Sequence, residues 1–196
     1  MSTLQHVFRK TAADKSKKKA KESDYELGLR HLLYPAQLAA LQGLPADAQV
    51  DANWGSIKEI PVSAPFAIAS GALGGVAPGV GTAITLGSGP IIHAGTKGIF
   101  NTKAGDTSVS HILGPARFVS YAGGTPEQQR QANWDHLKIL GSTILGGGLG
   151  GTLGYLTADN MKADPVMGAV LGALLGGAGG HAGSFLYMLN NRKNNK

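Results

Sequence analysis

The sequence predicts an all-α protein built from glycine-rich helical hairpins, with short amphipathic helices and flexible basic termini. Three observations support this fold class: glycine makes up 30 of the 196 residues, only 15% of the residues are charged, and small residues recur at every fourth position within long uncharged runs. Glycine costs about 1 kcal/mol relative to alanine in a helix in water. Such helices are better suited to lipid, where a helix satisfies its own backbone. We therefore expect four membrane helices arranged as two tandem repeats.

The chain begins with a basic segment, which we expect to form a flexible arm over residues 1–22. A second basic segment, residues 191–196, forms the tail. Such segments bind phosphate-rich surfaces, either anionic lipid or nucleic acid, and the alternative is a solvated chain end. The candidate residues for binding an anionic surface are Arg9, Lys10, Lys15, Lys17, Lys18, Lys19, Lys21, Arg192 and Lys193.

A short pattern recurs after 80 residues. The segment HLLYPA at residues 31–36 resembles HILGPA at residues 111–116, and the triplet ANW at 52–54 recurs at 132–134. Each copy then enters a glycine-rich apolar region. We interpret this pattern as two copies of one unit, the first over residues 23–103 and the second over residues 104–190.

Each copy is expected to open with short amphipathic helices, over about residues 23–44 and 106–121. They would lie either at a membrane surface or on a soluble core. Pro35 is expected to end or kink the helix in the first copy. In the second copy, Thr125 is a candidate N-cap for the next helix, because Pro126 would occupy its first position and Gln128 follows three residues after the cap.

The remaining helices are expected within the uncharged runs. Residues 139–156 and 166–189 should form a hairpin, since the shorter run would rise about 27 Å as a helix, close to a hydrocarbon core of about 30 Å. Residues 62–96 form either a similar pair that reverses at Pro78-Gly79 or one long kinked helix. The small residues would let neighbouring helices approach closely. The candidate packing residues are Gly71, Gly75, Gly79, Gly146, Gly150, Gly154, Gly168, Gly172, Gly176 and Gly180.

Aromatic and basic residues flank these runs. Trp54, Trp134, Tyr155 and Tyr187 are candidate interfacial anchors, because amphipathic rings favour the boundary between lipid and water. Lysine and arginine lie at the open ends of both expected hairpins. The positive-inside rule therefore predicts a multi-pass protein with both termini in the cytoplasm.

The sequence offers little for catalysis. Cysteine is absent, which excludes disulfides, thiolate metal sites and cysteine nucleophiles. The glycines at 146, 148 and 151 match a dinucleotide-binding fingerprint, but they lie in a glycine-rich run rather than after a strand. We expect no catalytic residue, cofactor or metal. His93 and His181, which lie within uncharged runs, are candidate intramembrane polar groups, and a hydrogen bond between helices is the alternative role.

These features favour a non-enzymatic integral membrane protein, structural or pore-forming, that contacts the lipid bilayer and associates with itself or within a larger complex. A virion component that breaches or lines a membrane for genome delivery is one alternative. A small channel or transporter that uses His93 and His181 is another. A soluble nucleotide-binding enzyme is a further alternative, which would use residues 139–164.

Overall fold

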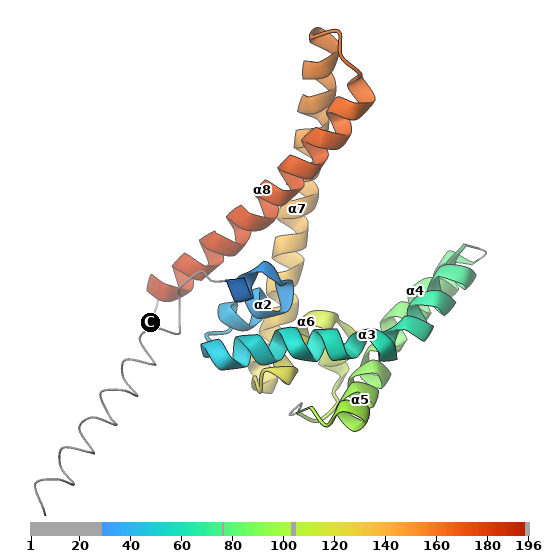
Figure 1. Ribbon diagram of the computed structural model, residues 1–196, viewed down its shortest axis with the longest axis vertical. Helices are drawn as coiled ribbons and strands as arrows, with labels where there is room; N and C mark the ends of the chain where they lie inside the picture. Colours follow the sequence, from blue (N-terminus) through green and yellow to red (C-terminus); the bar gives the residue numbers. More distant parts are fainter. Residues whose placement is uncertain (1–28, 76, 103–104, 195–196) are drawn as a thin grey trace, which may run out of the picture. The chain divides into compact units, whose positions relative to one another are not determined.

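The computed structural model describes residues 29–75, 77–102 and 105–194, and it places helices and turns but no strand among them (Figure 1). The all-α prediction is therefore confirmed for these residues. The chain divides into two compact units, residues 1–129 and 130–196. The predicted basic arm, residues 1–22, lies outside the described residues.

The first unit contains short helices around one long helix. In chain order these are the 3₁₀ turn η1 (Leu29–Leu32), α2 (Tyr34–Leu41), α3 (Ala46–Gly74), α4 (Pro78–Gly87), α5 (Gly89–Phe100), the 3₁₀ turn η2 (Val109–Ile112) and α6 (Gly114–Tyr121). Proline occupies one of the first two positions of α2, α4, α5 and α6. Proline is tolerated there because those N–H groups have no partner within the helix. Pro35, which was expected to end or kink a helix, lies at the second position of α2, and the preceding 3₁₀ turn ends at Leu32.

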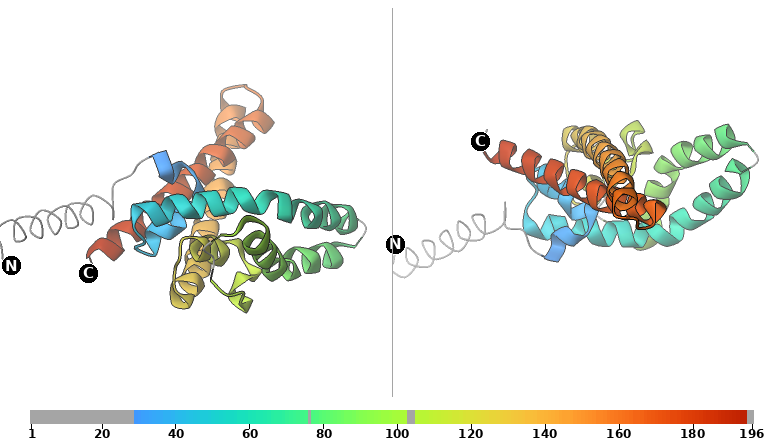
Figure 2. Two further views of the ribbon diagram at one scale, coloured as in Figure 1. Left: turned by 60° about the horizontal axis from the view of Figure 1, so that its bottom comes forward. Right: turned by 90° about the horizontal axis from the view of Figure 1, so that it is seen from above.

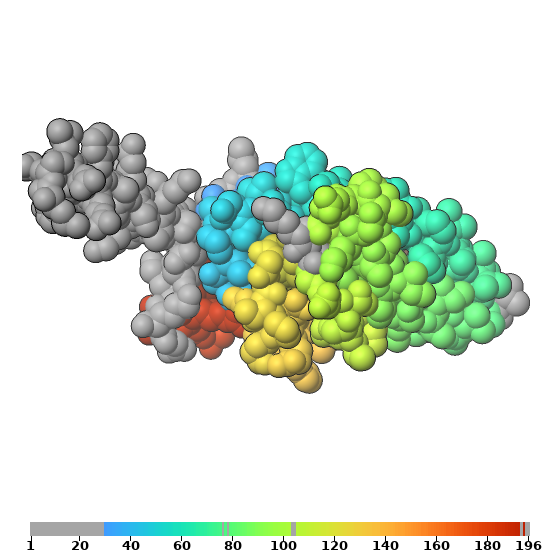
Figure 3. All heavy atoms as spheres, turned by 90° about the horizontal axis from the view of Figure 1, so that it is seen from below, coloured from blue at the N-terminus to red at the C-terminus, as the bar shows by residue number. Residues whose placement is uncertain are grey.

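A hairpin of α3 and α4 extends from this unit. The chain reverses after Gly75, and α4 and α5 then both contact α3 (Figure 2). The Ser70 hydroxyl donates a hydrogen bond of 2.8 Å to the Gly81 carbonyl across the hairpin. In the space-filling view, the atoms of α4 and α5 form a continuous body with those of α3 (Figure 3). Residues 62–96 thus form a helical pair with a reversal rather than one long helix.

Short helices recur at the 80-residue spacing that the sequence shows. η1 and α2 correspond in length and position to η2 and α6. A glycine with positive φ follows the C-cap of each helix, Gly43 at 69° after α2 and Gly123 at 75° after α6. The N–H of the next residue then bonds back into the helix, from Leu44 to Ala39 and from Gly124 to Val119, as in a Schellman cap.

Side-chain hydrogen bonds follow the same spacing. The Gln49 side-chain amide donates to the Leu44 carbonyl at 2.7 Å, and the Gln129 amide donates to the Gly124 carbonyl at 2.9 Å. These bonds fix the start of α3 and of α7 (Pro126–Asn160) against the preceding loop. The 80-residue pattern in the sequence is thus matched by local structure at both positions.

The second unit consists of two long helices, which form an antiparallel hairpin (Figure 1). The first is the part of α7 that follows residue 129, and the second is α8 (Pro165–Asn194). The predicted N-cap is present, because the Thr125 N–H donates to Gln128 Oε1 at 2.8 Å and the Gln128 N–H donates to Thr125 Oγ1 at 3.3 Å. The connector carries Lys162 at a φ of 56°. The Asp164 carboxylate then accepts the N–H of Val166 at 2.8 Å and so caps α8.

Candidate functional site

The two helices of the second unit touch along their glycines. A Cβ atom at Gly150 would overlap the carbonyl oxygen of Gly172, and a Cβ at Gly172 would overlap that of Gly150. The same reciprocal relation holds for Gly146 with Gly176 and for Gly154 with Gly168, while Gly180 lies against the Ser142 carbonyl. The structure therefore brings together all seven candidate packing glycines of this unit, at a separation that no side chain would permit.

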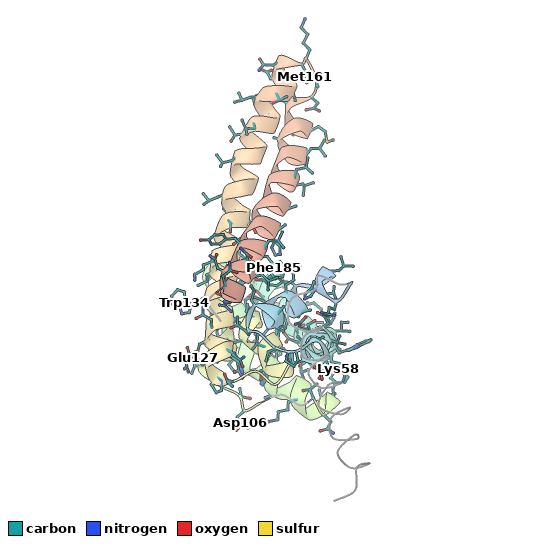
Figure 4. All side chains as sticks on the ribbon, turned by 90° about the vertical axis from the view of Figure 1, so that its left-hand side faces the viewer. Lys58, Asp106, Glu127, Trp134, Met161 and Phe185 are labelled. Carbon is teal, nitrogen blue, oxygen red and sulfur yellow. The ribbon has the colours of Figure 1, made fainter. Side chains whose placement is uncertain are left out.

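The outer faces of this hairpin are apolar and uncovered. Only 6% of the most apolar window in each helix is buried, and both helices are long and apolar enough to cross a membrane. Leu149 and Leu174 each expose about two thirds of their surface. Figure 4 shows side chains projecting outward along the length of the hairpin, with Met161 at the closed end. Soluble monomers rarely expose a continuous apolar surface of this kind.

Charged and titratable groups gather at the open end of the hairpin. Arg192 Nη2 pairs with Asp135 Oδ2 at 2.7 Å, and the Asp135 side chain is only 1% exposed. Burial, followed by the charge of His181, lowers the pKa of His136. Arg192, a candidate for binding an anionic surface, pairs through its guanidinium with a buried carboxylate on the neighbouring helix.

The glycines expected to pack in the first unit are used differently. A Cβ at Gly71 or Gly79 would meet nothing within 4 Å, and one at Gly75 would meet only its own helix. The close approach of α3 and α4 instead involves Gly81, where a Cβ would lie 2.6 Å from Gly74 Cα. The expected register fails because α3 ends at Gly74 and a new helix begins at Pro78, so a spacing of four does not continue through the reversal.

All four candidate anchors are exposed. Trp54 lies on α3, six residues before Ile60, where the uncharged run starts, and Trp134 lies on α7 shortly before the apolar run at 139. Tyr155 and Tyr187 are placed near the ends of their runs, on α7 and α8. Figure 4 shows Trp134 and Phe185 far from Met161, in the part of the hairpin toward its open end.

A buried polar cluster supports the first unit. Arg117 Nη2 donates to Glu59 Oε1 at 2.6 Å, Arg117 Nε lies at 3.1 Å from the same oxygen, and the Tyr121 hydroxyl donates to Glu59 Oε2 at 3.1 Å. The Arg117 and Glu59 side chains are at most 10% exposed. Burial, followed by the charge of Glu59, raises the pKa of Tyr121. The cluster ties α6 to the middle of α3, at the residue before its uncharged run.

His93 and His111 extend this cluster. His111 Nε2 lies 2.8 Å from Gln129 Oε1, while its Nδ1 accepts the Ser108 N–H at 3.0 Å, so the neutral ring carries its proton on Nε2. The ring centroids of His93 and His111 are 4.0 Å apart, and His93 Nε2 bonds to the Gly105 carbonyl at 3.2 Å. Burial lowers the pKa of both histidines, that of His93 to about 4. Both are therefore neutral at pH 7.

His93 thus lies in a polar cluster with Tyr121 and His111, and His181 lies on α8 in the other unit. His111 lies in the short 3₁₀ turn η2. Sequence reasoning missed the roles of Glu59 and Arg117. The available signal was a carboxylate at the edge of a long uncharged run, which requires a cation when it is buried.

The structure also bears on two kinds of site that the sequence analysis considered, a metal centre and a dinucleotide site. No three histidine, aspartate or glutamate side chains come together there as metal ligands. The glycines at 146, 148 and 151 lie inside α7, so they do not form the strand-to-helix turn that a dinucleotide site requires. Comparison of the chain with protein families, with curated proteins and with solved structures finds no match.

Proposed function

We propose that this chain is a non-enzymatic integral membrane protein whose α7–α8 hairpin spans the bilayer. The observation that carries the proposal is the division of faces on the hairpin. Glycines meet on the inside with backbone contact, and leucines cover the outside with almost no burial. In lipid, helix association depends on close packing of small residues, while large apolar residues face the acyl chains. This is the opposite of a helix pair in water, which would bury its leucines.

The dimensions support a spanning hairpin. The apolar part of α7, residues 139–156, rises about 27 Å, and that of α8, residues 166–189, rises about 36 Å with room for tilt. The connector around Lys162 is polar and would lie in water. Lys138 and Arg192 lie at the open end, so the positive-inside rule places this end in the cytoplasm.

The first unit would enter lipid with its α3–α4 hairpin, residues 60–87. This segment carries no charge, and Ile68 and Val80 are exposed on it. Together the two hairpins would be the membrane parts of two tandem copies, each introduced by the matched turns and short helices 80 residues apart. The helix pair in the first copy is shorter, because α4 has only 10 residues.

A structural or assembly role follows from the same faces. The seven packing glycines of α7 and α8 already face the partner helix within the hairpin. Association with a second copy or with another subunit would therefore use the outward leucine faces. A histidine-based channel has less support, since His93 is accounted for by the polar cluster of the first unit.

Extraction of membranes with alkaline carbonate tests this proposal. The full chain should stay with the lipid. Leu149→Lys together with Leu174→Lys should reduce its retention, because each lysine at the centre of a span costs about 3 kcal/mol. Met161→Lys, at the exposed connector, is the matched control and should change nothing. Release of the wild-type chain into the supernatant, or equal retention of all three, would refute the spanning hairpin.

A further inference from the structure

A cavity in the first unit has no role in the contacts described so far. It has a volume of about 190 Å³ and lies between α3 and the end of α5. One wall is a single face of α3, with Asp51, Trp54 and Lys58 at helical spacing. The opposite wall is formed by Asn101, Thr102 and the ring of Tyr121. Gly55 allows the Tyr121 ring to lie directly against α3, because a Cβ at this position would overlap the ring.

The polar groups of the cavity are not used within the part of the protein that the structure describes. Asp51 and Lys58 form no ion pair or hydrogen bond with another described residue. The Thr102 hydroxyl is buried and has no hydrogen-bond partner among the same residues. Asp51 and Lys58 are thus available to a ligand in the cavity.

The order of these groups along α3 matches one class of ligand. Moving toward the uncharged run that starts at Ile60, the chain presents first the carboxylate of Asp51, then the indole of Trp54, then the ammonium of Lys58. A phospholipid with an amine headgroup has the complementary order: its ammonium is outermost, its phosphate lies beneath, and its acyl chains are deepest. Carboxylate and indole both attract an ammonium group, and lysine binds phosphate as a point charge.

We propose that this cavity binds the headgroup of a zwitterionic phospholipid, with the ammonium at Asp51 and Trp54 and the phosphodiester at Lys58. The acyl chains would follow α3 past Ile60 and Ile68, which are exposed. This inference rests on the proposed function, because it requires the α3–α4 hairpin to enter lipid.

Retained lipid is the direct measurement. The full chain is reconstituted in vesicles of phosphatidylethanolamine and phosphatidylcholine, extracted gently and analysed by native mass spectrometry. The wild type should keep one zwitterionic lipid per chain. Asp51→Lys with Lys58→Asp leaves the net charge unchanged but reverses the polarity of the cavity, and it should reduce the retained lipid at least tenfold. Asp159→Lys with Lys162→Asp, an equal exchange at the hairpin connector, should retain lipid as the wild type does.

Two further arms separate the possible ligands. In a Trp134→Phe background Trp54 is the single tryptophan, so its fluorescence reports soluble phosphoethanolamine or inorganic phosphate. Binding of either without retention of vesicle lipid would show a free-phosphate site and would overturn the lipid assignment. Equal retention by the wild type and the cavity exchange, or equal retention of phosphatidylglycerol, would also overturn it. Loss of the chain from carbonate-washed membranes would instead refute the proposed function, and the fluorescence arm would still test the cavity.

Discussion

At the scale of single residues, the first unit depends on charges and polar groups held out of water. Glu59 accepts hydrogen bonds from both Arg117 and Tyr121. A buried ion pair contributes little net stability relative to apolar residues, but loss of one partner leaves an uncompensated charge. The neutral rings of His93 and His111 complete the cluster. These groups make the fold of the first unit sensitive to substitution and to acid.

Arg117→Met should lower the free energy of unfolding by about 3–5 kcal/mol, because Glu59 would remain buried and charged. Glu59→Gln combined with Arg117→Met should recover a large part of this loss, since neither charge is then left unpaired. Urea unfolding in mild detergent, followed by circular dichroism, measures both. A double variant as unstable as the single one would show that the ion pair is not the reason for the loss.

Acid should destabilise the first unit through His93. Its pKa is about 4 in the folded protein and about 6.5 when unfolded, because burial disfavours the charged ring. The unfolded chain therefore binds the proton first. The contribution of neutral His93 is complete above pH 6.5 and is lost as the pH falls toward 4, by at most about 1.4 kcal/mol per pH unit. Unfolding curves between pH 7 and 4 measure this slope, and His93→Phe should flatten it. An unchanged slope in that variant would assign the acid sensitivity to other groups.

At the scale of elements, the α7–α8 hairpin is defined by which glycines are covered. Gly150 lies against Gly172, whereas a Cβ at Gly148 on the same helix would meet nothing within 4 Å. Gly148 and Gly150 are two residues apart and therefore lie at the same level along the helix axis to within about 3 Å. They form a matched pair for testing helix contact.

Gly150→Leu should destabilise the hairpin by about 1–3 kcal/mol, the usual cost of overpacking, because its side chain has no space beside Gly172. Gly148→Leu should have an effect near zero, since its side chain points into open space. Unfolding by sodium dodecyl sulfate from mixed micelles reports the difference. Gly172→Leu with Gly176→Leu should disrupt the hairpin still further. Equal stability of the Gly150 and Gly148 variants would show that the glycine face is not the contact.

The sequence predicted the contact glycines correctly only where the helix that carries them is uninterrupted. In α7 and α8 a spacing of four runs without interruption, so the predicted glycines share one face. In the first unit the helix breaks after Gly74, and Gly81 makes the close contact that was expected of Gly79. The polar cluster was not predicted, because Glu59 and Arg117 are 58 residues apart in sequence and only the packing of α6 on α3 brings them together.

At the scale of the whole molecule, each unit has a distinct physical character. The first combines a buried polar cluster with the uncharged α3–α4 hairpin, and the second is an apolar hairpin with a buried ion pair at its open end. The 80-residue pattern predicted that short helices precede a long helix at two places in the chain, as η1 and α2 precede α3 and η2 and α6 precede α7. The sequence did not indicate that the chain of the first unit would return through α5 to form a polar core, because that core depends on contacts between residues distant in the chain.

The central claim is that the outer faces of α7 and α8 lie in lipid, and spin labelling tests it most directly. The chain has no cysteine, so Leu149→Cys and Met161→Cys each provide one attachment site in the protein reconstituted into liposomes. The label at position 149 should be relaxed more strongly by oxygen than by a water-soluble nickel complex, and the label at position 161 should show the reverse. Equal access of nickel to both positions would place the leucine face in water and contradict the account.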